Sequence, residues 1–284
     1  MSTVQPRSLI LDVYAAFVRR MDGWLAIADL VTLMDDLGQD EQSVRSAISR
    51  MKKAGLLAAE SRGGVAGYAL TEQAATILAD GDQRIFNSSQ PADLNEGWVV
   101  AVFSVPERER HRRHRLRSRL VWLGFGQVAS GVWIAPRRML PEARRLLERT
   151  GLSRYVTLFE GDYVGFEDLG ALIARTWDLH GLERLYAAFI ERYGPAIGEW
   201  QSSTDANREA FIKLTYALSE WRRLPYMDPG LPSEFLLPDW VGVRARDLFQ
   251  QLLDRLEYPA LAYVSQVVRD REELGRVSPA RSRS

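Results

Sequence analysis

The sequence predicts a mixed α and β protein of several domains. We expect a winged helix-turn-helix over residues 1–87, a ferredoxin-like βαββαβ domain over 98–165 and a helical domain over 166–276. Three observations predict this division. The first segment has helical apolar spacing and then two short strands around glycines, the second alternates strands and helices, and the third is helical with a proline-rich loop. A chain of 284 residues has room for two or three such domains.

Composition excludes several classes of site. The chain contains no cysteine, so disulfides, thiolate metal sites and cysteine nucleophiles are excluded. His111 and His114 have ligand-like spacing but lie among arginines, where a divalent cation is disfavoured, so we predict no metal and no cofactor. The N-terminus lacks a secretory pattern, and no apolar run approaches the ~18 residues that span a bilayer. We therefore expect a cytoplasmic protein that does not interact with membranes.

Charge is distributed unevenly, although basic and acidic residues number 37 each. Residues 1–87 hold 9 basic and 11 acidic side chains, whereas residues 98–166 hold 13 basic and 6 acidic ones. A nucleic-acid binder usually shows a basic excess. The acidic first segment therefore counts against strong DNA affinity of a single module and favours dimerisation.

The first segment begins with two predicted helices. Ser8 is a candidate N-cap for a helix that the pair Asp22-Gly23 ends. Residues 24–26 predict a short strand, and residues 27–37 predict a second helix. Gly38 should end that helix in a left-handed conformation.

The third predicted helix, 40–55, is the most informative element. Asp40 is a favourable N-cap, and an apolar stripe predicts its buried side: Val44, Ala47, Ile48 and Met51. The opposite side combines small hydrogen-bonding residues with cations, which are the groups that read base edges and hold phosphates. We predict that it contacts double-stranded DNA through Gln42, Ser43, Arg45, Ser46, Ser49, Arg50 and Lys53.

A glycine-rich β-hairpin should follow the third helix. Residues 56–70 read as two short strands around a turn that contains Gly63 and Gly64. Arg62 precedes this turn and is the DNA contact that we predict for the wing. Thr71 is a candidate cap for a last helix over 72–79.

The middle segment follows a polar linker, 88–97. We expect strands at 98–103, 127–128, 132–135 and 155–160, with helices at 107–123 and 141–150. The first helix is dense in arginine, and three interpretations stay open: a solvated face, an acidic partner across a dimer interface, or contact with the phosphate backbone. The strand end 103–106 contains no acid, so a metal-dependent nuclease is disfavoured.

The C-terminal segment should contain helices at 166–179, 182–193 and 206–224, and a final pair at 243–256 and 259–269. Arg222 and Arg223 end one of these helices, beside the loop that leads to Trp240. Two guanidiniums near an aromatic ring suit an acidic aromatic effector. They equally suit the negative end of a helix dipole.

These segments together resemble the PaaX family of repressors of phenylacetic acid catabolism. The shared motifs, in chain order, are SLI at 8–10, VRSAISRM at 44–51, YALT at 68–71, FSVPE at 103–107, GFG at 124–126, GVWIAP at 131–136, WRR at 221–223, DPGLP at 228–232 and LPDW at 237–240.

The resemblance implies an operator-binding winged helix, a middle domain similar to CRISPR-associated nuclease-related proteins that aids homodimerisation, and a domain that senses an acyl-CoA. Phenylacetyl-CoA is the effector expected from the family, and its binding would release the DNA. We expect a transcriptional repressor and not an enzyme. The alternatives are a regulator whose C-terminal domain only oligomerises, or one that answers to another aromatic acid or acyl-CoA. The effector contacts Arg222, Arg223 and Trp240 are predicted from chemistry alone.

Overall fold

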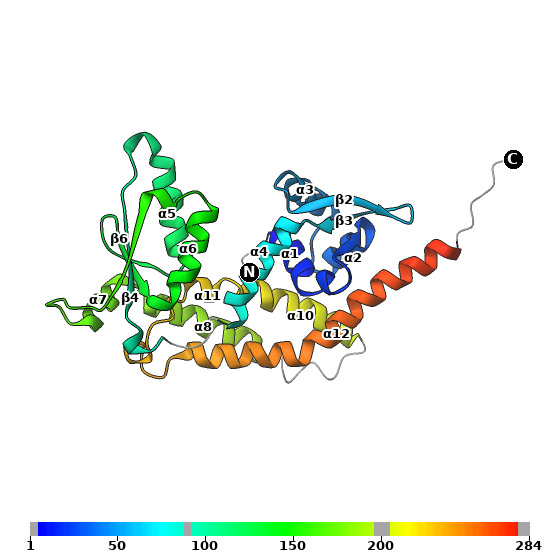
Figure 1. Cartoon of the computed structure of the whole chain (residues 1–284). Coiled ribbons are helices and arrows are strands. Elements are labelled where there is room, and N and C mark those ends of the chain that lie inside the picture. The colour runs from blue at the N-terminus through cyan, green and yellow to red at the C-terminus, as the bar shows by residue number, and fades with distance from the viewer. Residues whose placement is uncertain (1–4, 88–91, 196–204, 278–284) are drawn as a thin grey trace. The chain divides into compact units, whose positions relative to one another are not determined.

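The computed structural model describes residues 5–87, 92–195 and 205–277 (Figure 1). The chain forms two compact units. Within the described residues, unit 1 comprises 5–82, 191–195, 205–221 and 247–277, and unit 2 comprises 83–87, 92–190 and 222–246. The predicted mixture of α and β structure with a helical C-terminal part is confirmed. The boundaries of the three predicted domains stay a prediction. No described helix is long and apolar enough to cross a membrane.

The N-terminal part of unit 1 has the predicted order of elements. These are α1 (Pro6–Ala16), β1 (Trp24–Ala26), α2 (Ile27–Asp36), α3 (Glu41–Lys53), β2 (Leu57–Arg62), β3 (Val65–Leu70) and α4 (Glu72–Asn87). The prediction that Ser8 caps the first helix is wrong. Gln5 is the N-cap and Pro6 occupies the first turn, where the missing N–H costs nothing. The predicted helix at 72–79 is also longer, reaching Asn87.

The three strands of unit 1 form one antiparallel sheet in the order β1-β3-β2. The β2–β3 hairpin extends outward beside α3 (Figure 1). Its two-residue turn is formed by Gly63 and Gly64, which have φ of 57° and 82°. Positive φ at both central residues matches the right-handed twist of a hairpin, and glycine adopts it without steric cost.

The C-terminal helices α10 (Ala206–Trp221) and α12 (Val241–Val277) supply the rest of unit 1's core. Phe211 of α10 is fully buried and lies 5.5 Å from the Phe17 ring and 5.6 Å from the Tyr263 ring, centroid to centroid. The predicted pair of final helices is wrong, because α12 continues through Pro259. A buried stripe crosses the proline without interruption, and its packing outweighs the lost hydrogen bond: Leu252, Leu256, Ala260 and Val264.

Unit 2 is built on a four-stranded antiparallel sheet in the order β5-β6-β4-β7. Its elements follow the chain as β4 (Trp98–Phe103), α5 (Arg110–Trp122), β5 (Gly126–Ala129), β6 (Val132–Pro136), α6 (Leu140–Arg149) and β7 (Val156–Gly161). Alternate residues of β4 face opposite sides. Val99 and Ala101 pack under α5 and α6, whereas Trp98 packs towards α7 (Leu169–Thr176).

The remaining helices of unit 2 are short or shared. Instead of the predicted helix at 166–179, α7 starts at Leu169, because the Asp168 side chain accepts the N–H of Ala171 and caps it. Helix α8 (Leu179–Tyr193) follows, and α11 (Leu224–Met227) begins the proline-rich loop. Arg138 holds that loop by donating to the Gly230 carbonyl at 2.6 Å.

Candidate nucleic-acid interface

Helix α3 has the two faces that its sequence predicts. Asp40 caps it by accepting the N–H of Ser43 at 2.8 Å, and hydrogen bonds with the Ser43 side chain and backbone lower the pKa of the Asp40 carboxyl below its ordinary value. The predicted apolar stripe is buried in full: Val44, Ala47, Ile48 and Met51. Packing of that stripe fixes the rotation of the helix about its axis, so the polar residues on the opposite side must face solvent.

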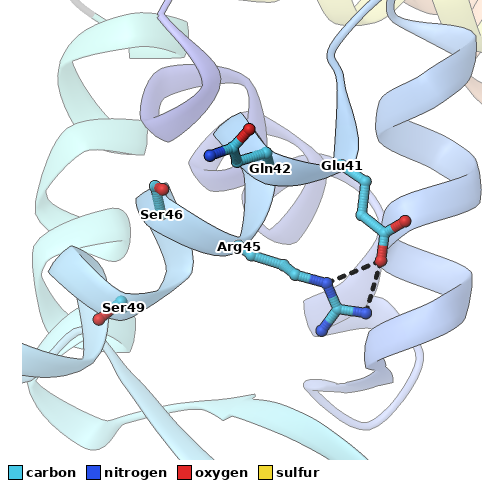
Figure 2. Close-up of a pocket in the computed structure, with 5 residues that line it drawn as sticks. All are labelled: Glu41, Gln42, Arg45, Ser46 and Ser49. Carbon is cyan, nitrogen blue, oxygen red and sulfur yellow. Dashed lines mark hydrogen bonds and ion pairs between the residues drawn. The ribbon is translucent and has the colours of Figure 1, made fainter.

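The polar face of α3 collects most of the predicted DNA contacts. Ser43 is half-buried beneath the cap, whereas the other predicted residues of the helix are exposed: Gln42, Arg45, Ser46, Ser49, Arg50 and Lys53. Four of these and Glu41 line an open hollow of about 550 Å³ (Figure 2). The hollow combines an amide, hydroxyls and a guanidinium, which are the donors and acceptors that can address base edges and phosphates.

Glu41 is a feature of this face that the sequence prediction missed. It precedes Arg45 by one helical turn, and its carboxylate Oε1 accepts from Arg45 Nε at 2.7 Å and Nη2 at 2.6 Å (Figure 2). Both side chains are more than half exposed. The i, i+4 spacing of Glu and Arg was the available signal. In this conformation the Arg45 guanidinium on the polar face is already paired with an anion.

Arg62, the predicted wing contact, is likewise paired. Its Nε lies 2.7 Å from Glu60 Oε1 and its Nη1 lies 2.5 Å from Asp22 Oδ2. The guanidinium also lies over the Trp24 ring, 5.3 Å from its centroid. Contact between Arg62 and a phosphate therefore requires exchange of one anionic partner for another.

The arginines of α5 divide into two groups. Arg113 pairs with Glu107 at 2.9 Å, and Arg112 pairs with Glu109 at 2.8 Å. Arg110, Arg115, Arg117 and Arg119 are exposed, and Arg117 donates to Gln127 Oε1 at 3.2 Å. The solvated, dimer-interface and phosphate-contact interpretations of this helix all stay open. Among the described residues, no group of three or more His, Asp or Glu is placed to hold a metal ion.

The predicted effector residues occupy the ends of two helices. Arg222 and Arg223 directly follow α10, and Trp240 directly precedes α12. Trp240 meets the Tyr186 ring edge-on at 5.9 Å, and the Tyr186 hydroxyl donates to Asp228 Oδ2 at 2.8 Å. Burial and the Asp228 charge raise the pKa of Tyr186, which keeps it a neutral donor. This cluster around Trp240 was not predicted, because Tyr186 and Trp240 are far apart in sequence.

Comparison with known proteins covers most of the chain. Family profiles match residues 5–74 as "PaaX-like protein", 91–173 as "PaaX protein central Cas2-like domain" and 177–266 as "PaaX-like protein C-terminal domain". The "Transcriptional repressor PaaX" of Escherichia coli (strain K12) is 27% identical over 268 residues, which span 93% of this chain and 84% of that protein. A solved structure of the uncharacterised protein Rv0674 from Mycobacterium tuberculosis shares the fold. It is 20% identical, with a TM-score of 0.59 over 90% of this chain and 97% of that one.

The polar helix α3, the Cas2-like middle domain and these matches define the class: a transcriptional regulator and not an enzyme. The chain belongs to the PaaX family of transcriptional repressors.

Proposed function

We propose that unit 1 reads operator DNA as a winged helix, with α3 in the major groove and the β2–β3 hairpin as the wing. The observation that carries the proposal is the polar face of α3, where every exposed predicted residue lies opposite a fully buried stripe. The contacts that we assign to bases and phosphates are Gln42, Ser43, Arg45, Ser46, Ser49, Arg50, Lys53 and Arg62. The segment's acidic balance limits the affinity of one module, since phosphate contacts supply most of the binding energy.

We further propose that the repressor is a homodimer that reads two half-sites one or two helical turns apart, roughly 10 or 20 bp. The middle domain, with its antiparallel order β5-β6-β4-β7, supports assignment to the ferredoxin-like class, and we assign dimerisation to it. This arrangement offsets the weak attraction of each acidic DNA-binding segment, because two linked modules bind more tightly than one.

The regulated operon in this proposal encodes catabolism of an aromatic acid, phenylacetate, and the inducer is an acyl-CoA such as phenylacetyl-CoA. Family membership supports this assignment, and Arg222, Arg223 and Trp240 are the candidate contacts. The inducer must bind the DNA-incompetent conformation better than the competent one. A coupling of about 1–3 kcal/mol, or roughly 5–150-fold in affinity, is typical.

The test is a fluorescence-anisotropy titration of the full chain onto its own promoter DNA, with and without phenylacetyl-CoA. Binding that phenylacetyl-CoA weakens supports both the operator and the inducer assignments. Binding that ignores this thioester retains the operator assignment and removes the inducer. Failure to prefer promoter DNA over a random duplex contradicts the repressor proposal itself.

Arg45→Ala gives a residue-level test of the interface. We expect the substitution to remove operator discrimination, because a bidentate arginine–base contact contributes about 1–3 kcal/mol. The matched control is Arg269→Ala, which removes an exposed arginine from α12. A variant that keeps both its thermal stability and its preference for the operator would show that α3 is not the reading helix.

A further inference from the structure

The end of α2 is held by side chains that arrive from distant parts of unit 1. Asp36 is the last residue of α2, and its side chain is only 10% exposed. Its Oδ1 accepts from Arg208 Nε of α10 at 2.7 Å, and its Oδ2 accepts from the Tyr263 hydroxyl of α12 at 2.5 Å. The next residue, Leu37, offers its carbonyl to the Tyr216 hydroxyl of α10 at 2.7 Å. Both carboxylate oxygens and the adjacent carbonyl are therefore occupied.

Local helix stability does not explain an aspartate at this position. A negative charge at a helix C-terminus is unfavourable, because it faces the negative end of the helix dipole. The last turn of α2 contains no basic residue to compensate. The charge is instead neutralised by Arg208, and burial together with the Asp36 hydrogen bond raises the pKa of Tyr263, so that it remains a donor. The interactions with α10 and α12 thus explain why an aspartate is stable at the C-terminal end of α2.

The donors themselves are held in place by the core. Tyr263 packs against Phe211, which packs against Phe17, and both phenylalanines are fully buried. Close packing restricts the rotamers of the Tyr263 ring. Its hydroxyl is therefore held at the position from which it donates to Asp36. The position of α2's end therefore follows the positions of α10 and α12.

The turn that follows transmits this position to α3. The N–H of Gly38, whose φ is 68°, donates to the Asp35 carbonyl at 2.8 Å, and the N–H of Gln39 donates to the Met34 carbonyl at 2.9 Å. Asp40 then caps α3. Each residue between α2 and α3 is thus tied to one of the two helices, so that a shift of Asp36 carries the polar face of α3 with it.

We infer that Asp36, Arg208, Tyr216 and Tyr263 are positioning residues for DNA recognition. We name them the α2 clamp: they set the placement of α3 from the two C-terminal helices. The inference rests on the proposed function of α3. Helices α10 and α12 are also the helices whose ends carry Arg222, Arg223 and Trp240. A change in either helix would reach the DNA-reading face through the clamp, without any effector contacting α3.

The test uses Tyr263→Phe and Tyr216→Phe in the full chain, each of which removes one hydroxyl and keeps the ring. The affinity of each variant is measured for a duplex selected from a random-sequence pool by the wild-type chain, and for an unselected duplex of equal length. We expect affinity for the selected duplex to fall about five-fold, the worth of one hydrogen bond, with affinity for the unselected duplex unchanged. The matched control is Tyr258→Phe, whose ring lies on α12 and is 82% exposed.

Asp36→Asn serves as the second variant, because asparagine keeps the shape and one acceptor oxygen. Its melting temperature and the hydrogen exchange of residues 41–53 are measured alongside. Loss of preference for the selected duplex in a variant that melts well above the assay temperature supports the clamp. The inference is overturned if the ratio of the two affinities is unchanged in all three variants, including the case in which both affinities fall by the same factor. A wild-type chain that selects no sequence would instead contradict the proposed function.

Discussion

Replacing Glu41 with glutamine should tighten DNA binding while slightly destabilising the protein. Glu41 pairs with Arg45 at 2.6 Å on the polar face of α3. In the proposed complex, Glu41 competes with DNA for the Arg45 guanidinium. The carboxylate also lies in the first turn of α3, where a negative charge interacts favourably with the helix dipole and stabilises the helix. One substitution therefore acts on binding and on stability with opposite signs.

The exposed fractions of the two side chains set the size of the effect on DNA binding. The side chains of Glu41 and Arg45 are 57% and 55% exposed, so the pair contributes only about 0.3–0.5 kcal/mol. Freeing Arg45 recovers that amount on DNA binding, and about 0.3–0.5 kcal/mol corresponds to about two-fold tighter binding per protomer. Removing the negative charge of Glu41 acts in the same direction, because it no longer repels the DNA phosphates. Loss of the dipole interaction and of the ion pair together should lower the unfolding free energy by about 0.6–1.5 kcal/mol.

The assay is an anisotropy titration at fixed salt, paired with urea unfolding of the same preparations. Glu72→Gln is the matched control, because Glu72 is an exposed glutamate at the first position of α4. It should lose only the dipole part of that stability, about 0.3–1 kcal/mol, and leave DNA affinity unchanged. Weaker or unchanged DNA binding by Glu41→Gln would refute the view that Glu41 and DNA compete for Arg45.

Two further predictions concern the stability of unit 1. Phe211→Ala should lower the unfolding free energy by about 3–5 kcal/mol in urea titrations, because its ring is fully buried against two others. A loss no greater than that of Phe166→Ala, a fully exposed control, would contradict this. Acid should destabilise the wild type more than Asp40→Asn, because the pKa of the Asp40 carboxyl is lowered in the folded state. The stabilising effect of Asp40 is therefore present above about pH 4 and is lost as the pH falls through the pKa of the folded state. Melting temperatures followed by circular dichroism from neutral to acid pH measure this, and parallel acid dependence of the two proteins would contradict it.

The faces of α3 were predictable because they depend on local spacing. Apolar residues at Val44, Ala47, Ile48 and Met51 recur with the helical period, and the structure buries all four. The cap at Asp40 and the glycine turn of the hairpin are local as well. Continuation of α12 through Pro259 was not predictable from propensity, because tertiary packing of the residues on both sides decides it.

The contacts around Asp36 had no sequence signal. Arg208 and Tyr263 are 172 and 227 residues away from it in the chain, and only the assembled core brings them together. The same limit applies to the effector site. Trp240 was proposed from its aromatic character, but the cluster that surrounds it depends on Tyr186 and Asp228, which no local pattern connects to it.

The anionic partners of Arg45 and Arg62 have a consequence for how long the repressor stays on DNA. In the proposed complex, each guanidinium that leaves the DNA finds a carboxylate within its own reach, at Glu41 for Arg45 and at Glu60 and Asp22 for Arg62. Dissociation then proceeds as an exchange of partners, without passing through a bare cation. Since differences in affinity appear mostly in dissociation rates, we expect short residence times. If the proposed inducer acts by releasing DNA, short residence lets operator occupancy follow the inducer concentration without delay from slow dissociation.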